Sequence, residues 1–236
     1  MNRRGAAAEA LAASYLLARG LAIAHRNYRC RFGEIDLIAR DGPTLVVGPG
    51  TGFGAAVRMP ALPRPVVLAT EAGQAALTTT TELETAVLRE LQREHHHVAV
   101  EHALSGPGLM RIHDALRRLR GQGIAFDSPG EITAAALAGS DTGATESLSV
   151  FCGLLGGTVG DMALLYGVRG GIYLAGGILA QIRGFLPASG FVERFLDKGP
   201  MRGALQGIPV KLLEHGQLGV VGAASWYLDL RAGTQS

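Results

Sequence analysis

The chain has 236 residues, a length that fits one large domain or two small ones. Hydrophobic residues make up 47% and charged residues 18%, a globular composition that excludes a largely disordered chain. The formal net charge is +2, and the basic residues are spread along the chain apart from short arginine clusters, so composition does not favour nucleic acid as a partner.

The first part of the chain predicts a helix followed by strands. An alanine-rich segment, 5–19, predicts a helix that stops before Gly20, a residue type that commonly ends helices. Extended runs separated by turn residues then predict strands at 22–31, 34–39 and 44–47. Prolines and glycines become frequent between residues 48 and 65, which predicts loops or a domain boundary rather than regular structure.

Helices are predicted to dominate after residue 80. Thr81 with Glu84, and Ser128 with Glu131, have the spacing of capping boxes, in which a hydroxyl and a carboxylate satisfy free amides at a helix start. Hydrophobic spacing predicts helices at 81–94, 131–138, 142–167, 178–186 and 218–228, with strands at 171–175 and 208–213. This alternation predicts an α/β or α+β layered fold.

The segment 149–168 is apolar enough to resemble a membrane span. It carries Asp161 near its middle and five glycines, so we expect instead a buried, closely packed helix in which Asp161 makes a structural hydrogen bond. Cys30 and Cys152 are the only cysteines, which gives no disulfide framework. Because no convincing secretion cleavage site follows the N-terminus, these features together predict a cytoplasmic protein with no membrane partner.

The strand 44–47 leads into a loop of glycines, GPGTGFG at 48–54. Without side chains the backbone can approach a ligand closely, and its amides form a concavity that binds anions such as phosphate. No Lys-Ser or Lys-Thr follows, which excludes a Walker loop, and Phe53 takes the third glycine position of a dinucleotide fingerprint. Prolines at 60, 63 and 65 exclude a following helix. The remaining interpretation is the strand, loop, strand arrangement of actin-like ATPases, with a plain tight hairpin as the alternative.

Separate sequence motifs accompany this loop in a recognisable order. They are LVVGPGTGFG at 45–54, EAGQ at 71–74, HVAVE at 97–101, LSGPGL at 104–109 and GGIYLAGGI at 170–178. In order and spacing they resemble the motifs of the bacterial ATP-dependent glucokinase family. The resemblance covers about 44–228 and implies an α/β fold, the actin-like ATPase (ribonuclease H-like) large domain of a sugar kinase.

The resemblance also implies roles for individual residues. The glucose-binding residues would be Glu71, Gln74 and Glu101, whose polar groups can pair with sugar hydroxyls. Gln74 stands where the family has histidine, and its amide can still donate and accept hydrogen bonds. The resemblance implies that the ATP phosphates lie against Gly50, Thr51 and Gly52, and the adenosine against Gly176 and Gly177. The implied ligands are ATP with Mg²⁺ and glucose or a related hexose, and a homodimer is the expected assembly.

The N-terminal segment contains other motifs, GAAAE at 5–9, YL at 15–16 and GEIDLI at 33–38. These resemble the UPF0102 (YraN) endonuclease-like family, which implies a partial restriction-endonuclease-like α/β fragment with Glu9 and Asp36 in a metal-dependent nuclease site. That family continues into Val-Glu-Val-Lys, whereas this chain continues into the glycine loop. We therefore predict a chimeric chain, with this fragment over 1–43 and a glucokinase large domain over 44–236.

Three functions follow as alternatives. The first is phosphorylation of glucose to glucose 6-phosphate, for which the resemblance implies an aspartate base in the family's N-terminal half; no residue here matches it, so no catalytic residue is assigned. The second is an inactive fusion or remnant that retains sugar and nucleotide binding, and the third is a YraN-like nuclease. No metal site is predicted, because His95, His96 and His97 are consecutive and point in different directions.

Overall fold

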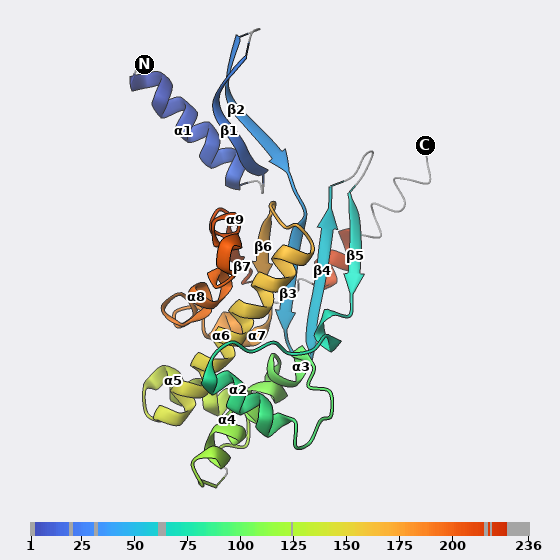
Figure 1. Ribbon diagram of the computed structural model, residues 1–236, viewed down its shortest axis with the longest axis vertical. Coiled ribbons are helices and arrows are strands. Elements are labelled where there is room, and N and C mark those ends of the chain that lie inside the picture. The colour runs from blue at the N-terminus through green and yellow to red at the C-terminus, as the bar shows by residue number, and fades with distance from the viewer. Residues whose placement is uncertain are drawn as a thin grey trace.

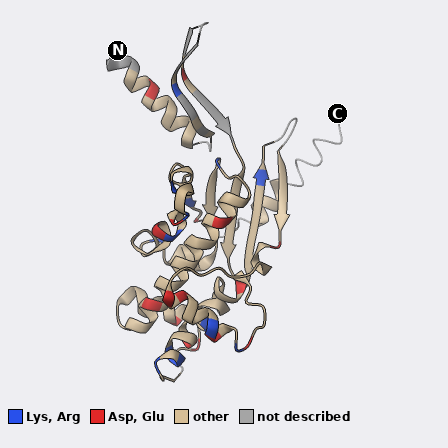
Figure 2. Cartoon of the chain, viewed as in Figure 1, with Lys and Arg blue, Asp and Glu red and all other residues tan. Residues whose placement is uncertain are grey.

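The computed structural model describes residues 3–18, 21–30, 33–60, 65–123, 125–214, 217 and 219–225. Its main body is a five-stranded sheet flanked by helices of the C-terminal half, and a helix and a hairpin from the N-terminal segment extend beyond one end of that sheet (Figure 1). Among the described residues, Lys, Arg, Asp and Glu lie mainly on the helices, and the five-stranded sheet carries few of them (Figure 2).

The N-terminal segment forms a unit with its own small sheet. Helix α1 covers Arg3–Ala18, and the antiparallel strands β1, Leu21–Cys30, and β2, Gly33–Asp41, form a two-stranded sheet. The predicted helix and the first two predicted strands are confirmed within the described residues. The hairpin makes no strand pairing with the larger sheet. A hydrogen bond of 3.2 Å from Lys211 Nζ to the Ala18 carbonyl links the two parts.

The larger sheet has the strand order β5-β4-β3-β6-β7. Its strands are β3, Thr44–Pro49; β4, Phe53–Met59; β5, Val66–Thr70; β6, Gly171–Leu174; and β7, Val210–Leu212. The first three form an antiparallel meander, and β6 and β7 run parallel to β3. The carboxyl ends of β3, β6 and β7 therefore meet at one edge, where open α/β sheets bind their ligands.

The prediction of loops between residues 48 and 65 was wrong for β4. Val57 of this strand is completely buried opposite Leu45 of β3, so pairing and burial stabilise a strand in a glycine-rich region. Pro60 follows the end of β4 and Pro65 precedes β5. Proline lacks the amide that a sheet ladder needs, and here it flanks the strands without interrupting them.

Helices connect and cover the sheet. They are α2, Glu82–Leu91; α3, Val100–Ala103; α4, Gly106–Leu119; α5, Pro129–Ala138; α6, Thr142–Leu165; α7, Gly177–Gln181; α8, Phe191–Leu196; and α9, Arg202–Gln206. Single 3₁₀ turns form at η1, Ala72–Gln74; η2, Leu186–Ala188; and η3, Gly199–Met201.

Most helix predictions after residue 80 are confirmed, with two corrections. The Thr81 hydroxyl accepts the Glu84 amide at 3.1 Å and the Glu84 carboxylate accepts the Thr81 amide at 3.3 Å, so the first capping box is real. The helix predicted for 178–186 ends early, at Gln181, before the helix-breaking Gly184. Helices α3, α4, α8 and α9 were not predicted. Residues 219–225 are helical, while residues 218 and 226–228 of that prediction lie outside the described residues.

Helix α6 is the centre of the hydrophobic core. Among the described helices it alone is long and apolar enough to cross a membrane, yet 78% of its most apolar window is buried in the fold, as predicted. A Cβ on Gly156 would overlap the Phe191 carbonyl, so α6 and α8 touch through their backbones. Asp161 makes the expected structural bonds, accepting from Thr78 at 3.0 Å and pairing with Lys198 at 2.7 Å, although it is only partly buried.

A buried ion pair joins α2 to α8. Arg194 Nε and Nη2 donate to the two Glu84 carboxylate oxygens at 2.9 and 3.0 Å, and both side chains are at least nine-tenths buried. Burial alone would raise the pKa of Glu84, but Arg194 and the amides of Thr80 and Thr81 outweigh burial and hold that pKa below its ordinary value. The carboxylate thus stays ionised inside the fold.

Candidate functional site

The glycine loop, residues 50–52, joins β3 to β4 at the carboxyl edge of the parallel strands. The pairs Gly48 with Gly54 and Pro49 with Phe53 close the hairpin, and the Gly50 amide donates to the Gly52 carbonyl at 2.8 Å. Gly50 and Thr51 are exposed. The tip of the hairpin is therefore open to a ligand, and other predicted site segments surround its base.

The predicted sugar-binding segment, residues 71–74 (the sugar segment), lies against the β4 side of the loop. The Gln74 amide donates to the Glu71 carbonyl at 2.9 Å, which makes one tight turn with both side chains exposed. A Cβ on Gly73 would overlap the Phe53 carbonyl, so only glycine lets this turn sit on the strand. His97 Nε2 bonds to the Gln74 carbonyl at 2.8 Å and links the turn to the next motif.

Glu101 reaches the glycine loop from α3. Its Oε2 lies 2.8 Å from where a Cβ on Gly52 would stand, so the missing side chain at Gly52 makes room for the carboxylate. Backbone bonds of 2.9 Å from Leu77 to Val98 and from Val100 to Ala75 pair the chain after the sugar segment with the chain before Glu101. The structure thus brings Glu101, the sugar segment and the loop together.

The start of α4 also touches the loop. The Gly106 amide donates to the Gly50 carbonyl at 2.8 Å, and the Ser105 hydroxyl caps the helix by accepting the Gly108 amide at 3.0 Å. The amino end of a 14-residue helix carries partial positive charge, so this contact favours an anion at the loop. The sequence reasoning missed this helix, although serine before Gly-Pro is a usable start signal.

The predicted adenosine-binding segment, which contains Gly176 and Gly177, contacts the loop hairpin from the β6 side, opposite the sugar segment. The Ala175 amide donates to the Val47 carbonyl at 2.8 Å, which carries β6 alongside β3. Gly176 has φ of +122°, and a Cβ there would overlap the Pro49 carbonyl. Gly177 then begins α7, with open space around the position of its missing Cβ.

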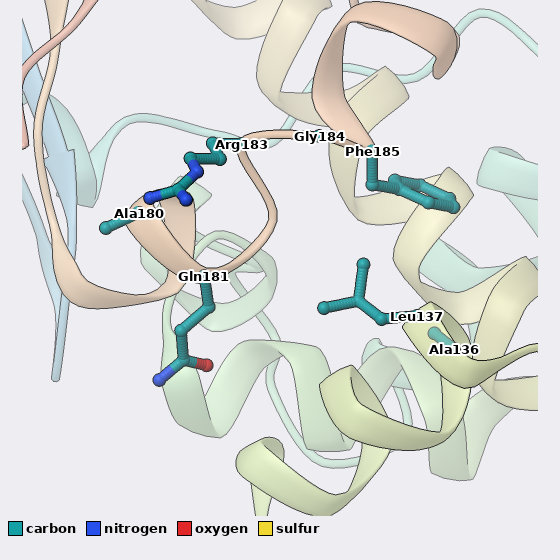
Figure 3. A pocket seen from close by; sticks show the side chains of 7 residues that line it. All are labelled: Ala136, Leu137, Ala180, Gln181, Arg183, Gly184 and Phe185. Atoms are coloured by element: carbon teal, nitrogen blue, oxygen red, sulfur yellow. The ribbon is translucent and has the colours of Figure 1, made fainter.

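A cavity of about 600 Å³ opens beside α7. Its wall combines α5 and α7 with the chain after α7, and its lining residues are Ala136, Leu137, Ala180, Gln181, Arg183, Gly184 and Phe185. Leu137 and Phe185 supply apolar surface, and the amide of Gln181 and the guanidinium of Arg183 supply polar groups (Figure 3). The sequence motifs included Gly177, which begins α7, but did not reveal this cavity.

The strained turn at Gly176 gives a test of the loop. Replacing Gly176 by alanine is expected to lower the free energy of unfolding by about 1–3 kcal/mol and to weaken the nucleotide binding that the sequence motifs imply, because the backbone must leave a conformation that alanine rarely adopts. Thermal melts and AMPPNP titration measure both effects. Alanine at Gly203 on α9, which has free space around its missing Cβ and lies outside the predicted site, is the matched control; equal behaviour of the two variants would contradict this account.

Two further predictions concern metals: that His95, His96 and His97 form no metal site, and that Glu9 and Asp36 belong to a metal-dependent nuclease site. The described residues contain no group of three His, Cys, Asp or Glu side chains placed to hold a metal ion. His95 instead stacks on His102, with ring centroids 4.0 Å apart. Glu9 on α1 and Asp36 on β2 belong to the N-terminal unit, which lies at the other end of the large sheet from the glycine loop (Figure 1).

Comparison with known families adds a family-level match. The family model described as Glucokinase matches residues 14–230. A glucokinase-like protein of Xylella fastidiosa is 55% identical over 194 residues, which are 82% of this chain and 58% of the relative. The glucokinase of Saccharophagus degradans is 40% identical over 185 residues, 78% of this chain and 58% of the relative. The chain thus spans 58% of the length of these curated relatives.

Solved structures give the same fold. The crystal structure of a glucokinase from an Antarctic psychrotroph has a TM-score of 0.73 and 34% identity, covering 92% of this chain and 65% of that one. The glucokinase of Balamuthia mandrillaris, in complex with glucose, has a TM-score of 0.65 at 17% identity, covering 88% of this chain and 60% of that one. The predicted α/β sugar-kinase fold is confirmed. The match from residue 14 also reaches into the segment predicted to be UPF0102-like, for which no comparison gives support.

Proposed function

We propose, since the chain belongs to the glucokinase family, that it binds ATP and glucose or a related hexose on the two sides of the loop 50–52. One observation carries the proposal: the loop has the Glu101 carboxylate against Gly52 and the Gly176 turn against Pro49. A hexose hydroxyl and the terminal phosphate of a nucleotide would therefore meet over the same few backbone atoms. Phosphoryl transfer needs that juxtaposition.

The hexose would be held by Glu71, Gln74 and Glu101. Carboxylates accept hydrogen bonds from paired hydroxyls, and the amide of Gln74 both donates and accepts. Support comes from the backbone pairing and the bond from His97, which hold the sugar segment and the α3 segment in fixed relation. A polar ligand needs such fixed polar groups for its orientation.

The nucleotide would extend from the loop into the cavity beside α7. Its phosphates would lie against Gly50, Thr51 and Gly52, where backbone amides and the amino end of α4 favour negative charge. Gly176 and Gly177 would let the backbone lie close to the adenosine. The cavity between α5 and α7 is large enough for a base. Mg²⁺ would be held mainly by the phosphates, as is usual for this ion with nucleotides.

Turnover is a separate part of the proposal. Transfer to a sugar hydroxyl needs a group that accepts its proton, and no residue of this chain matches the family's aspartate for that role. Phosphorylation of glucose to glucose 6-phosphate is therefore proposed by family membership, and binding without turnover is the alternative.

The homodimer, the cytoplasmic location and the domain boundary between residues 43 and 44 remain predictions. A UPF0102-like origin of residues 1–43 is supported only by their motifs and by their separate two-stranded sheet.

The test separates binding from turnover. Glucose and AMPPNP with Mg²⁺ should each raise the melting temperature of the folded chain, because a ligand that binds only the folded state stabilises it. At a hundredfold excess over Kd the gain is about 2.7 kcal/mol. A coupled assay of glucose-dependent ADP formation then decides on catalysis. No shift with either ligand, using protein with a cooperative melt, would reject the proposed site.

A further inference from the structure

His102 is the side chain that caps the amino end of α3, the helix that carries Glu101. At the other end of α3, Ser105 and Arg111 donate to the carbonyls of Glu101 and His102. Helix α3 has four residues, and the residue before it, Ala99, offers no side-chain cap. The Ala99 amide donates instead to Nδ1 of His102 at 3.2 Å. Because Nδ1 accepts this bond, neutral His102 carries its proton on Nε2. Glutamate or glutamine commonly fills this third helical position in capping boxes.

The surroundings of His102 oppose its protonation. Its ring stacks on His95 with centroids 4.0 Å and planes 20° apart, and Nε2 of His95 is buried without a partner among the described residues. The titratable and charged groups around the ring are His95, His97, Glu101 and Arg111. Burial first, and then the charges of His95 and Arg111, lower the pKa of His102, against the opposing pull of Glu101.

We propose that His102 is a titratable positioning residue for the sugar site: its neutral ring holds α3 and Glu101 in place, and its protonation releases them. An imidazolium has a hydrogen on both nitrogens, so Nδ1 can no longer accept the Ala99 amide. The amide would then lose its partner at the start of the turn that carries Glu101 against Gly52. This inference rests on the proposed binding of a hexose at Glu101.

The direction of the pH effect follows from the lowered pKa. A histidine with a depressed pKa contributes stability that is complete above its unfolded pKa, about 6.5. That contribution is lost as pH falls through the lower pKa of the folded state. Sugar affinity should therefore be highest above pH 7 and should fall as the pH drops below about 6.5 and His102 takes up its proton. Loss of one helix cap corresponds to about a fivefold rise in the glucose Kd.

The experiment compares wild type with three variants by glucose titration at pH 7.5 and at a pH below the titration midpoint of the His102 ring, read from its NMR signals. His102→Gln keeps an acceptor at the capping position but does not titrate, so its Kd should change by less than about twofold between the two pH values. His102→Phe keeps a stacking ring without an acceptor, so its Kd should be raised at both. His96→Gln is the matched control, since His96 is exposed, and it should keep the wild-type pH dependence.

A sugar-free measurement distinguishes the possible failures. In the unliganded full chain, the Ala99 amide signal in ¹H–¹⁵N spectra should titrate together with the His102 ring, and should not titrate in His102→Gln. An Ala99 signal that stays constant while the His102 ring titrates would overturn the switch whatever the sugar does. Titration of Ala99 with an unchanged glucose Kd would overturn its coupling to Glu101. Titration of Ala99 with no glucose binding at pH 7.5 would reject the proposed function, and the sugar role of His102 with it.

Discussion

Replacing Arg194 by methionine is expected to lower the free energy of unfolding by about 3–5 kcal/mol, because it leaves the Glu84 carboxylate buried without its partner. Both side chains are at least nine-tenths buried and share two hydrogen bonds of 2.9 and 3.0 Å. For a chain of this size the loss corresponds to about 6–20 °C in melting temperature. Chemical and thermal denaturation measure it.

The double variant Glu84→Gln with Arg194→Met is the matched control. Glutamine can still accept the amides of Thr80 and Thr81 and so preserves the start of α2, while it removes the unpaired charge. The double variant should therefore recover most of the stability lost in Arg194→Met. If both variants are equally destabilised, the cost comes from lost packing of the arginine and not from the buried charge.

Glutamine at Glu101 is expected to raise the glucose Kd by about 10- to 100-fold. Hydrogen bonds to a charged group contribute about 1.5–3 kcal/mol, and the substitution keeps the shape of the side chain while it removes the charge. The melting temperature should stay near that of wild type, since Glu101 is only partly buried and has no ion pair among the described contacts. Calorimetric titration with glucose gives the affinity.

Glu193→Gln is the matched control for Glu101. Glu193 is an exposed glutamate on α8, and its replacement should leave glucose binding unchanged. Glu71→Gln should weaken binding in the same direction as Glu101→Gln, because both carboxylates belong to the proposed sugar site. Unchanged affinity in Glu101→Gln, with wild-type stability, would remove this residue from the site.

Local chemistry was enough to predict much of this fold. The helix start at Thr81 has the predicted capping box, and such local interactions are visible in the sequence. At Ser128 the hydroxyl accepts the Glu131 amide as predicted, but the Glu131 carboxylate accepts the Asp127 amide in place of the Ser128 amide. Helix α6 was predictable because its small residues indicate close packing. Composition predicted loops where β4 lies, since this segment becomes a strand through pairing with β3 and burial of Val57. Only the strand, loop, strand interpretation of the glycine loop anticipated a strand there.

The candidate site shows the same difference between local patterns, which the sequence reveals, and long-range contacts, which it does not. The motifs named Glu71, Glu101 and Gly176, but they did not reveal that Glu101 fits into the space left by Gly52, or that Gly176 touches Pro49. Those contacts join residues far apart in the chain, and no local pattern records them. The cap from His102 was missed because histidine is not a usual capping residue.

The central claim is that a hexose and a nucleotide meet over the glycine loop. A crystal structure of the full chain with glucose and AMPPNP–Mg²⁺ tests it most directly. The account predicts sugar hydroxyls on Glu71 and Glu101, phosphates against Gly50–Gly52, and the base in the cavity beside α7. Either ligand bound elsewhere in well-defined density, with the loop empty, would contradict it.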